Sequence, residues 1–154
     1  MDKEELYLKT IFSCMVCDGN IAPEEIGLVR ELANSSELFK GFDVEKHLNA
    51  YITEINANGA RFLSRYLSEL AASELDKEQQ MNIVNLSLKT IEADNVIEYS
   101  EVKFFKKIRS RLSLTDGEIL KCHPDKGDFL LPDVNVNEEP ALDGISFGPI
   151  DLKL

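Results

Sequence analysis

A nine-residue segment near the start of the chain occurs a second time further along it. Residues 18–26 align without gaps on residues 94–102, so each position of the second copy lies 76 residues (94 minus 18) after its counterpart. Both copies have the pattern Asp-x-x-Ile-x-x-x-Glu, and the apolar positions that follow it also coincide. Self-similarity of this kind indicates two related supersecondary units that face each other across one core.

The sequence around both copies has the apolar spacing of amphipathic helices. Of the five prolines only Pro23 precedes residue 124, and proline suits the first turn of a helix. No segment shows convincing strand alternation bounded by hairpin turns. The expected helices cover residues 8–16, 23–33, 44–58, 62–71, 77–91, 102–112 and 116–121. We therefore predict an all-α fold, a compact bundle of about six to seven helices made of two pseudo-repeated helix–loop–helix units.

Several helix ends can be placed from capping residues. Asp43 and Asp76 precede the third and fifth expected helices, where a side-chain oxygen accepts from the first free backbone amides. Thr115 and Glu118 have the spacing of a capping box at the start of the last helix. The pair Asn58-Gly59 is expected to end the third helix.

The composition changes at residue 122. Residues 1–121 are expected to form the helical domain, whereas residues 122–154 hold four of the five prolines with seven acidic and two basic residues. This segment also carries apolar side chains, among them Phe129, Leu142 and Ile150, which are costly to leave in water. We interpret residues 122–154 as an extended acidic and apolar tail that either packs on its own domain or binds another protein.

The protein is acidic, with a formal net charge of −11 and a pI near 4.6. Binding to phosphates or anionic lipid needs a positive surface, so we expect no nucleic-acid binding and no membrane insertion. The N-terminus lacks the character of a signal peptide, and no apolar stretch reaches membrane-spanning length. Together with only three cysteines, these features predict a cytoplasmic protein. The negative charge fits one that binds a cation or meets a basic protein partner.

The two repeated loops carry the residues that favour cation binding. Asp18 and Asp94 stand where a helix should end, and there the free carbonyls and the helix dipole disfavour a further negative charge. Glu25 and Glu101, about a turn into the next helix, can fold back toward the same loop. Carboxylates and carbonyls around one loop suit Ca²⁺ or Mg²⁺, although the loop is shorter than that of an EF-hand. The candidate metal ligands are Asp18, Asn20 and Glu25 in the first copy and Asp94, Glu98 and Glu101 in the second.

The same residues also have a purely structural interpretation. A glutamate in the first turn of a helix is favoured by the dipole without any metal. Asp-Gly and Asp-Asn are ordinary helix-stopping dipeptides, and Ile21 and Ile97 can fill the core. The alternative to a cation-binding module is therefore a metal-free helical scaffold or interaction domain whose tail binds a partner.

The repeated pattern helix–Asp-Gly-x-Ile-x-x-x-Glu–helix resembles the TerB-like family, named for a bacterial tellurite-resistance protein. The resemblance covers about residues 5–121, including the ending from Leu112 to Glu118, and Asn95 replaces the usual glycine of the second copy. It implies an all-helical fold with no established catalysis, in a protein of tellurite, other chemical stress or phage-defence responses. It also implies weak divalent-metal binding by the acidic positions, which here are Asp18, Glu25, Asp94 and Glu101.

Three other patterns have simpler interpretations. The C-x-x-C of Cys14 and Cys17 lies inside a helix, which favours buried thiols over redox chemistry or a zinc pair completed by Cys122 and His123. The tripeptide His-Pro-Asp at residues 123–125 matches that of J-domains but lacks the long basic helix before it. The lysines and arginines of residues 103–111 are expected to form a solvated face, with an acidic partner as the alternative.

The sequence offers little for catalysis. It contains neither a glycine-rich phosphate loop nor a nucleophile elbow, and His47 and His123 are its only histidines. Paired carboxylates can transfer protons, yet no recognition elements accompany them. We therefore expect a protein that is not an enzyme.

Overall fold

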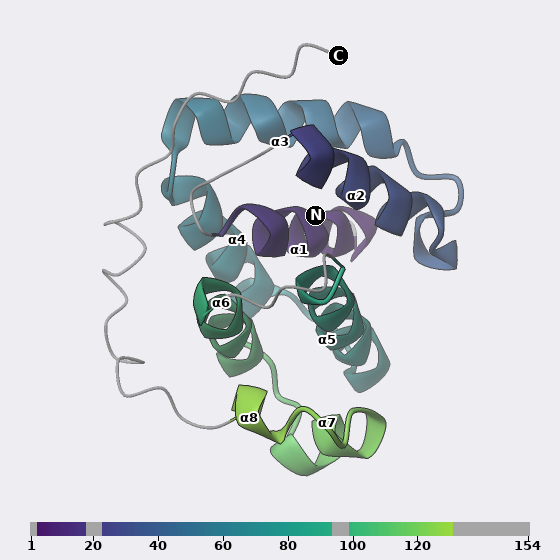
Figure 1. Ribbon diagram of the computed structural model, residues 1–154, viewed down its shortest axis with the longest axis vertical. Helices are drawn as coiled ribbons and strands as arrows, with labels where there is room; N and C mark the ends of the chain where they lie inside the picture. Colours follow the sequence, from purple (N-terminus) through teal and green to yellow (C-terminus); the bar gives the residue numbers. More distant parts are fainter. Residues whose placement is uncertain (1–2, 18–22, 94–98, 131–154) are drawn as a thin grey trace.

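The computed structural model describes residues 3–17, 23–93 and 99–130 of the chain, and these form helices and no strands (Figure 1). The predicted all-α fold is confirmed. No helix of the described residues is long and apolar enough to cross a membrane. The helices are α1 (Lys3–Val16), α2 (Pro23–Asn34), α3 (Val44–Asn58), α4 (Arg61–Ala72), α5 (Lys77–Ile91), α6 (Tyr99–Ser110), α7 (Asp116–Cys122) and α8 (Gly127–Leu130), with a 3₁₀ turn over Glu37–Phe39.

The capping residues set the helix ends as predicted. The Asp43 carboxylate accepts from the Lys46 amide at 3.1 Å, and the Thr115 hydroxyl accepts from the Glu118 amide at 3.1 Å. Asp76 forms a full capping box with Gln79, a partner that the sequence analysis did not single out. These ends depend on residues three positions apart, which is why they could be recognised from the sequence alone.

Helix α1 is the centre of the bundle. It packs against α2, α3, α4, α5 and α6, and in Figure 1 it runs between α2 and α3 on one side and α5 and α6 on the other. Every residue from Leu6 to Cys17 is buried. A helix surrounded in this way has no solvent-facing stripe, so its polar side chains must find partners inside the protein.

Two polar residues of α1 are satisfied by α4. The Lys9 ammonium donates to the Glu69 carboxylate at 2.9 Å and lies 5.5 Å from the ring centre of Tyr51 and 5.7 Å from that of Phe62. The aromatic faces and the carboxylate together replace the water that Lys9 loses on burial. Thr10 and Tyr66 share a hydrogen bond of 2.6 Å between their hydroxyl groups.

The internal repeat is preserved in the helices. Helix α6 begins and ends 76 residues after α2, at Tyr99 against Pro23 and at Ser110 against Asn34. The same offset relates buried positions of α1 and α5: Leu8 corresponds to Val84 and Phe12 to Leu88, all at most 2 % exposed. The two predicted units are therefore α1–α2 and α5–α6, and α1 packs directly on α5.

The segment after residue 121 differs from the expected extended tail where the structure describes it. Helix α7 continues to Cys122, and α8 follows, with Leu130 packed on the cluster of Val84, Leu88 and Phe105. The turn between α7 and α8 is held on α5, since Lys126 pairs with Glu92 and His123 bonds to Asn85 at 2.6 Å. The sequence analysis missed α8 because four residues are too few for a periodic pattern.

We expect Glu69→Gln to lower the free energy of unfolding by roughly 2 kcal/mol, because the Lys9 ammonium would keep its burial and lose its counter-charge. Urea denaturation followed by circular dichroism measures this. Glu54→Gln, which removes the partner of the exposed Arg65, is the matched control and should cost much less. Equal losses in the two variants would show that the buried Lys9–Glu69 pair stabilises the protein no more than the exposed Glu54–Arg65 pair does.

Candidate functional site

Two of the six candidate metal ligands lie in the described structure. Glu25 and Glu101 occupy the first turns of α2 and α6, and both are half-buried. Asp18, Asn20, Asp94 and Glu98 lie outside the described residues. The equivalent placement of the two glutamates follows from the equal offsets of α2 and α6.

The second unit places its glutamate beside the first unit. The Cys17 thiol, directly after α1, donates to the carbonyl of Ser100 in the first turn of α6 at 3.8 Å. The negative charge of Glu101 also contributes to a raised pKa of Cys14 in α1, after the larger effect of burial. The sequence analysis assigned Asp94 and Glu101 to the second loop; Asp94 lies outside the described residues, so this assignment stays a prediction.

Negative charge gathers at this junction of α1 and α6. The last turn of α1 contains no basic residue, and the carbonyl end of a helix carries partial negative charge. A carboxylate close to that end adds to the negative potential, which Ca²⁺ or Mg²⁺ would relieve with oxygen ligands. Within residues 3–17, 23–93 and 99–130, no three histidine, cysteine or acidic side chains are grouped to hold a metal. A complete site therefore requires residues of the two loops.

The cysteines of the C-x-x-C motif are buried free thiols, as predicted. Burial raises the pKa of Cys14 to about 12, with Glu101 adding to the rise and a hydrogen bond with Ser87 opposing it. The Cys17 thiol donates to the carbonyl of Cys14 at 3.3 Å. A thiol that stays protonated in apolar surroundings is a poor nucleophile and a poor metal ligand.

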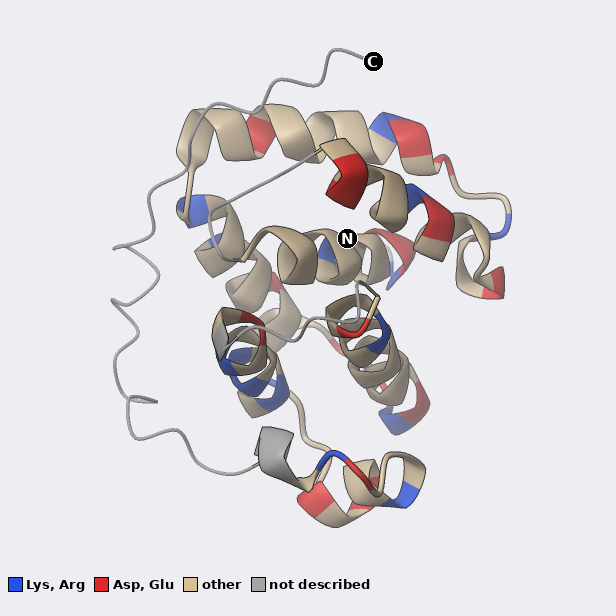
Figure 2. Ribbon diagram, in the orientation of Figure 1, with Lys and Arg blue, Asp and Glu red and all other residues tan. Residues whose placement is uncertain are grey.

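The basic residues of α6 differ from the expected solvated face. In Figure 2 the Lys and Arg positions, coloured blue, gather along the α6 ribbon. Lys103 and Lys106 are half-buried and Lys107 is buried, and none of them has an acidic partner among the described residues. Arg109 pairs with Asp116 of α7. The lysine stems thus pack on the protein, as amphipathic side chains do when only the charged end reaches water.

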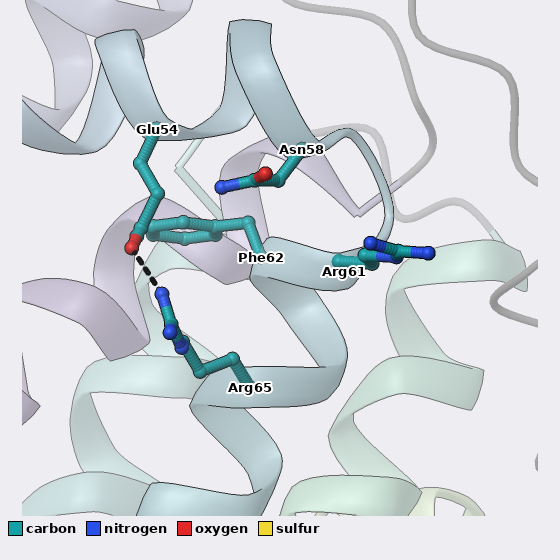
Figure 3. Close-up of a pocket in the computed structure, with 5 residues that line it drawn as sticks. All are labelled: Glu54, Asn58, Arg61, Phe62 and Arg65. Atoms are coloured by element: carbon teal, nitrogen blue, oxygen red, sulfur yellow. Dashed lines mark hydrogen bonds and ion pairs between the residues drawn. The ribbon is translucent and has the colours of Figure 1, made fainter.

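One pocket lies where α3 meets α4. It has a volume of about 240 Å³ and is lined by Glu54, Asn58, Arg61, Phe62 and Arg65. Figure 3 shows Glu54 and Arg65 pointing toward each other beside the Phe62 ring, while Arg61 points away. Glu54 and Arg65 form an ion pair of 2.8 Å with each other. Their charged groups are therefore already paired and do not face the pocket as binding groups for a ligand.

A larger groove of about 440 Å³ lies between α2 and the end of α5. Its apolar floor is formed by Leu28, Leu32 and Ala93, with charged residues at its rim. Leu28 and Leu32 are among the apolar positions that coincide between the two copies, with Phe104 and Ile108 as their counterparts. Their partial exposure could not be predicted from the sequence, because it depends on which distant helix packs over them.

Comparison of the chain with protein-family models, with curated proteins and with solved structures gives no match. The resemblance to the TerB-like family therefore depends on the repeated loop motifs themselves.

In the native protein at pH 8, we expect a thiol reagent such as dithionitrobenzoate to modify Cys122 alone, because Cys122 is exposed and the other two thiols are buried. Since the pKa of Cys14 is about 12, raising the pH to 9 should leave that thiol protonated and unreactive. Absorbance should report one thiol in the native protein and three in urea. Fast modification of three native thiols would contradict this arrangement.

Proposed function

We propose that this chain is a non-enzymatic interaction module that acts through protein partners and whose acidic interhelical loops bind Ca²⁺ or Mg²⁺ weakly. The observation that carries the cation part is the junction of α1 and α6, where Glu101 lies near the end of a helix that has no basic residue in its last turn. A bound cation would stabilise both the carboxylate and the carbonyl end of α1. Binding is weak because each loop offers few ligands.

The partner-binding part is supported by α6. The half-buried Lys103 and Lys106, which have no acidic partner in the described structure, create local positive charge on an acidic protein. Such a surface favours an acidic protein segment as its partner. From the resemblance to the TerB-like family we propose that this activity belongs to responses to tellurite, other chemical stress or phage.

The second candidate is a metal-free helical scaffold. It is favoured by the positions of Glu25 and Glu101 in the first turns of α2 and α6, where the helix dipole stabilises a carboxylate without any cation. In that case the acidic residues serve only the helix ends.

A titration of the chelator-treated full chain separates the two candidates. With 10 mM Ca²⁺ or Mg²⁺ and an affinity near 1 mM, the melting temperature should rise by roughly 3–5 °C. Asp18→Asn and Glu101→Gln should each reduce this rise. Glu24→Gln, at the exposed neighbour of Glu25 in the same turn, is the matched control and should preserve it.

The double variant Asp18→Asn/Glu101→Gln tests whether the two units share a site. If both residues contact one cation, the double variant should lose less of the stabilisation than the sum of the losses in the two single variants. Absence of any melting shift or binding heat with either ion would establish the metal-free scaffold instead.

A further inference from the structure

The two units of the repeat bury equivalent side chains to different extents. On α6, Phe104 and Ile108 are at most 2 % exposed. Their counterparts on α2, 76 residues earlier, are Leu28 and Leu32, and these are only half-buried. The same face of the same kind of helix is thus covered in the second unit and open in the first.

The helix that covers this face in the second unit is α4. Tyr66 of α4 stacks on Phe104 with ring centres 6.3 Å apart, and the end of α1 lies against the start of α6. In the first unit, α3 instead packs on another side of α2, where Arg30 pairs with Glu45 at 2.8 Å. No described helix takes the place of α4 over Leu28 and Leu32, and this leaves the groove between α2 and α5.

We propose that the C-terminal segment of this chain, through residues 142–152, folds back and fills the groove between α2 and α5. This inference is independent of cation binding and names what covers the open face of the first unit. The apolar residues of the segment are Leu142, Ile145, Phe147, Ile150 and Leu152. The groove offers them Leu28, Leu32 and Ala93 as an apolar floor in a volume of about 440 Å³.

The described structure brings the start of this segment to the groove. Lys126 pairs with Glu92, which itself lines the groove, and Leu130 packs on the cluster that contains Ile91. The 24 residues 131–154 that follow can extend about 80 Å, far more than the width of the bundle requires. A segment tethered this close has an effective concentration in the millimolar range, so even a weak intramolecular contact is populated.

Charges contribute little to this contact. Residues 131–154 contain five carboxylates and one lysine. The charged residues at the rim are Glu31, Lys89 and Glu92. Glu92 is paired with Lys126, so Lys89 can meet a carboxylate of the segment, while Glu31 opposes it. The described part of the chain is itself acidic overall, so burial of apolar surface, rather than long-range attraction, provides most of the binding free energy.

The experiment uses the absence of tryptophan from the chain. In the full-length protein, Phe147→Trp introduces a single fluorophore into the segment. If the segment occupies the groove, its emission should be blue-shifted by about 10 nm or more relative to the urea-unfolded chain, and acrylamide quenching should fall at least threefold. Both signals should persist in 1 M NaCl and on dilution, because the contact is apolar and intramolecular.

Groove variants then locate the contact. Leu28→Ser/Leu32→Ser should return the tryptophan emission to that of a solvent-exposed indole, whereas Leu38→Ser, at a half-buried leucine outside the groove, should leave it unchanged. Ala93→Phe fills the groove without removing core packing and should release the segment in the same way. Circular dichroism verifies that each variant is folded. If Leu28→Ser/Leu32→Ser does not fold, the emission of the Ala93→Phe variant alone tests the proposal.

Three results would overturn the proposal. Solvent-like emission in the full-length chain would show a free segment. Blue-shifted emission that is unchanged by Ala93→Phe would place the segment elsewhere on the domain. Loss of the blue shift on dilution would show that the contact is between two chains. None of these affects the Ca²⁺ and Mg²⁺ titration, so the failure of one hypothesis is distinct from the failure of the other.

Discussion

The fold depends on one helix that has no solvent-facing side. Because α1 is buried from Leu6 to Cys17, its polar residues impose requirements on the helices around it. Lys9 requires a carboxylate and aromatic faces, and α3 and α4 supply Glu69, Tyr51 and Phe62 at the right places. The ion pair thereby fixes the position of α4 relative to α1, and α4 in turn covers the second unit of the repeat.

The repeat determines equivalent positions, but it does not determine equivalent surroundings. Helices α2 and α6 have the same length and the same offset, yet α6 lies under α4 while α2 packs against α3. One consequence is that the first turn of α6 meets the end of α1, where the Cys17 thiol donates to the carbonyl of Ser100. Another is the open groove beside Leu28 and Leu32, where the first unit lacks the covering helix of the second.

The sequence predicted what depends on neighbouring residues. Helix ends at Asp43, Asp76 and Thr115 were correct because the cap and its amide lie within three positions of each other. The burial of Lys9 could not be predicted, since periodicity assumes that a helix has an exposed face. The position of Glu101 near α1 and the half-exposure of Leu28 depend on which distant helix packs where, and no local pattern contains that information.

The central position of the N-terminal helix has a consequence for the order of events during synthesis. Helix α1 leaves the ribosome before its partners α5 and α6, which end only at Ile91 and Ser110. At usual rates of elongation this leaves an apolar helix without these two partners for roughly 5–20 s. Contacts so distant in sequence also slow folding relative to helical bundles with local topology. The nascent chain therefore exposes its most apolar helix longest, and a chaperone or an early partner would meet α1 before the bundle encloses it.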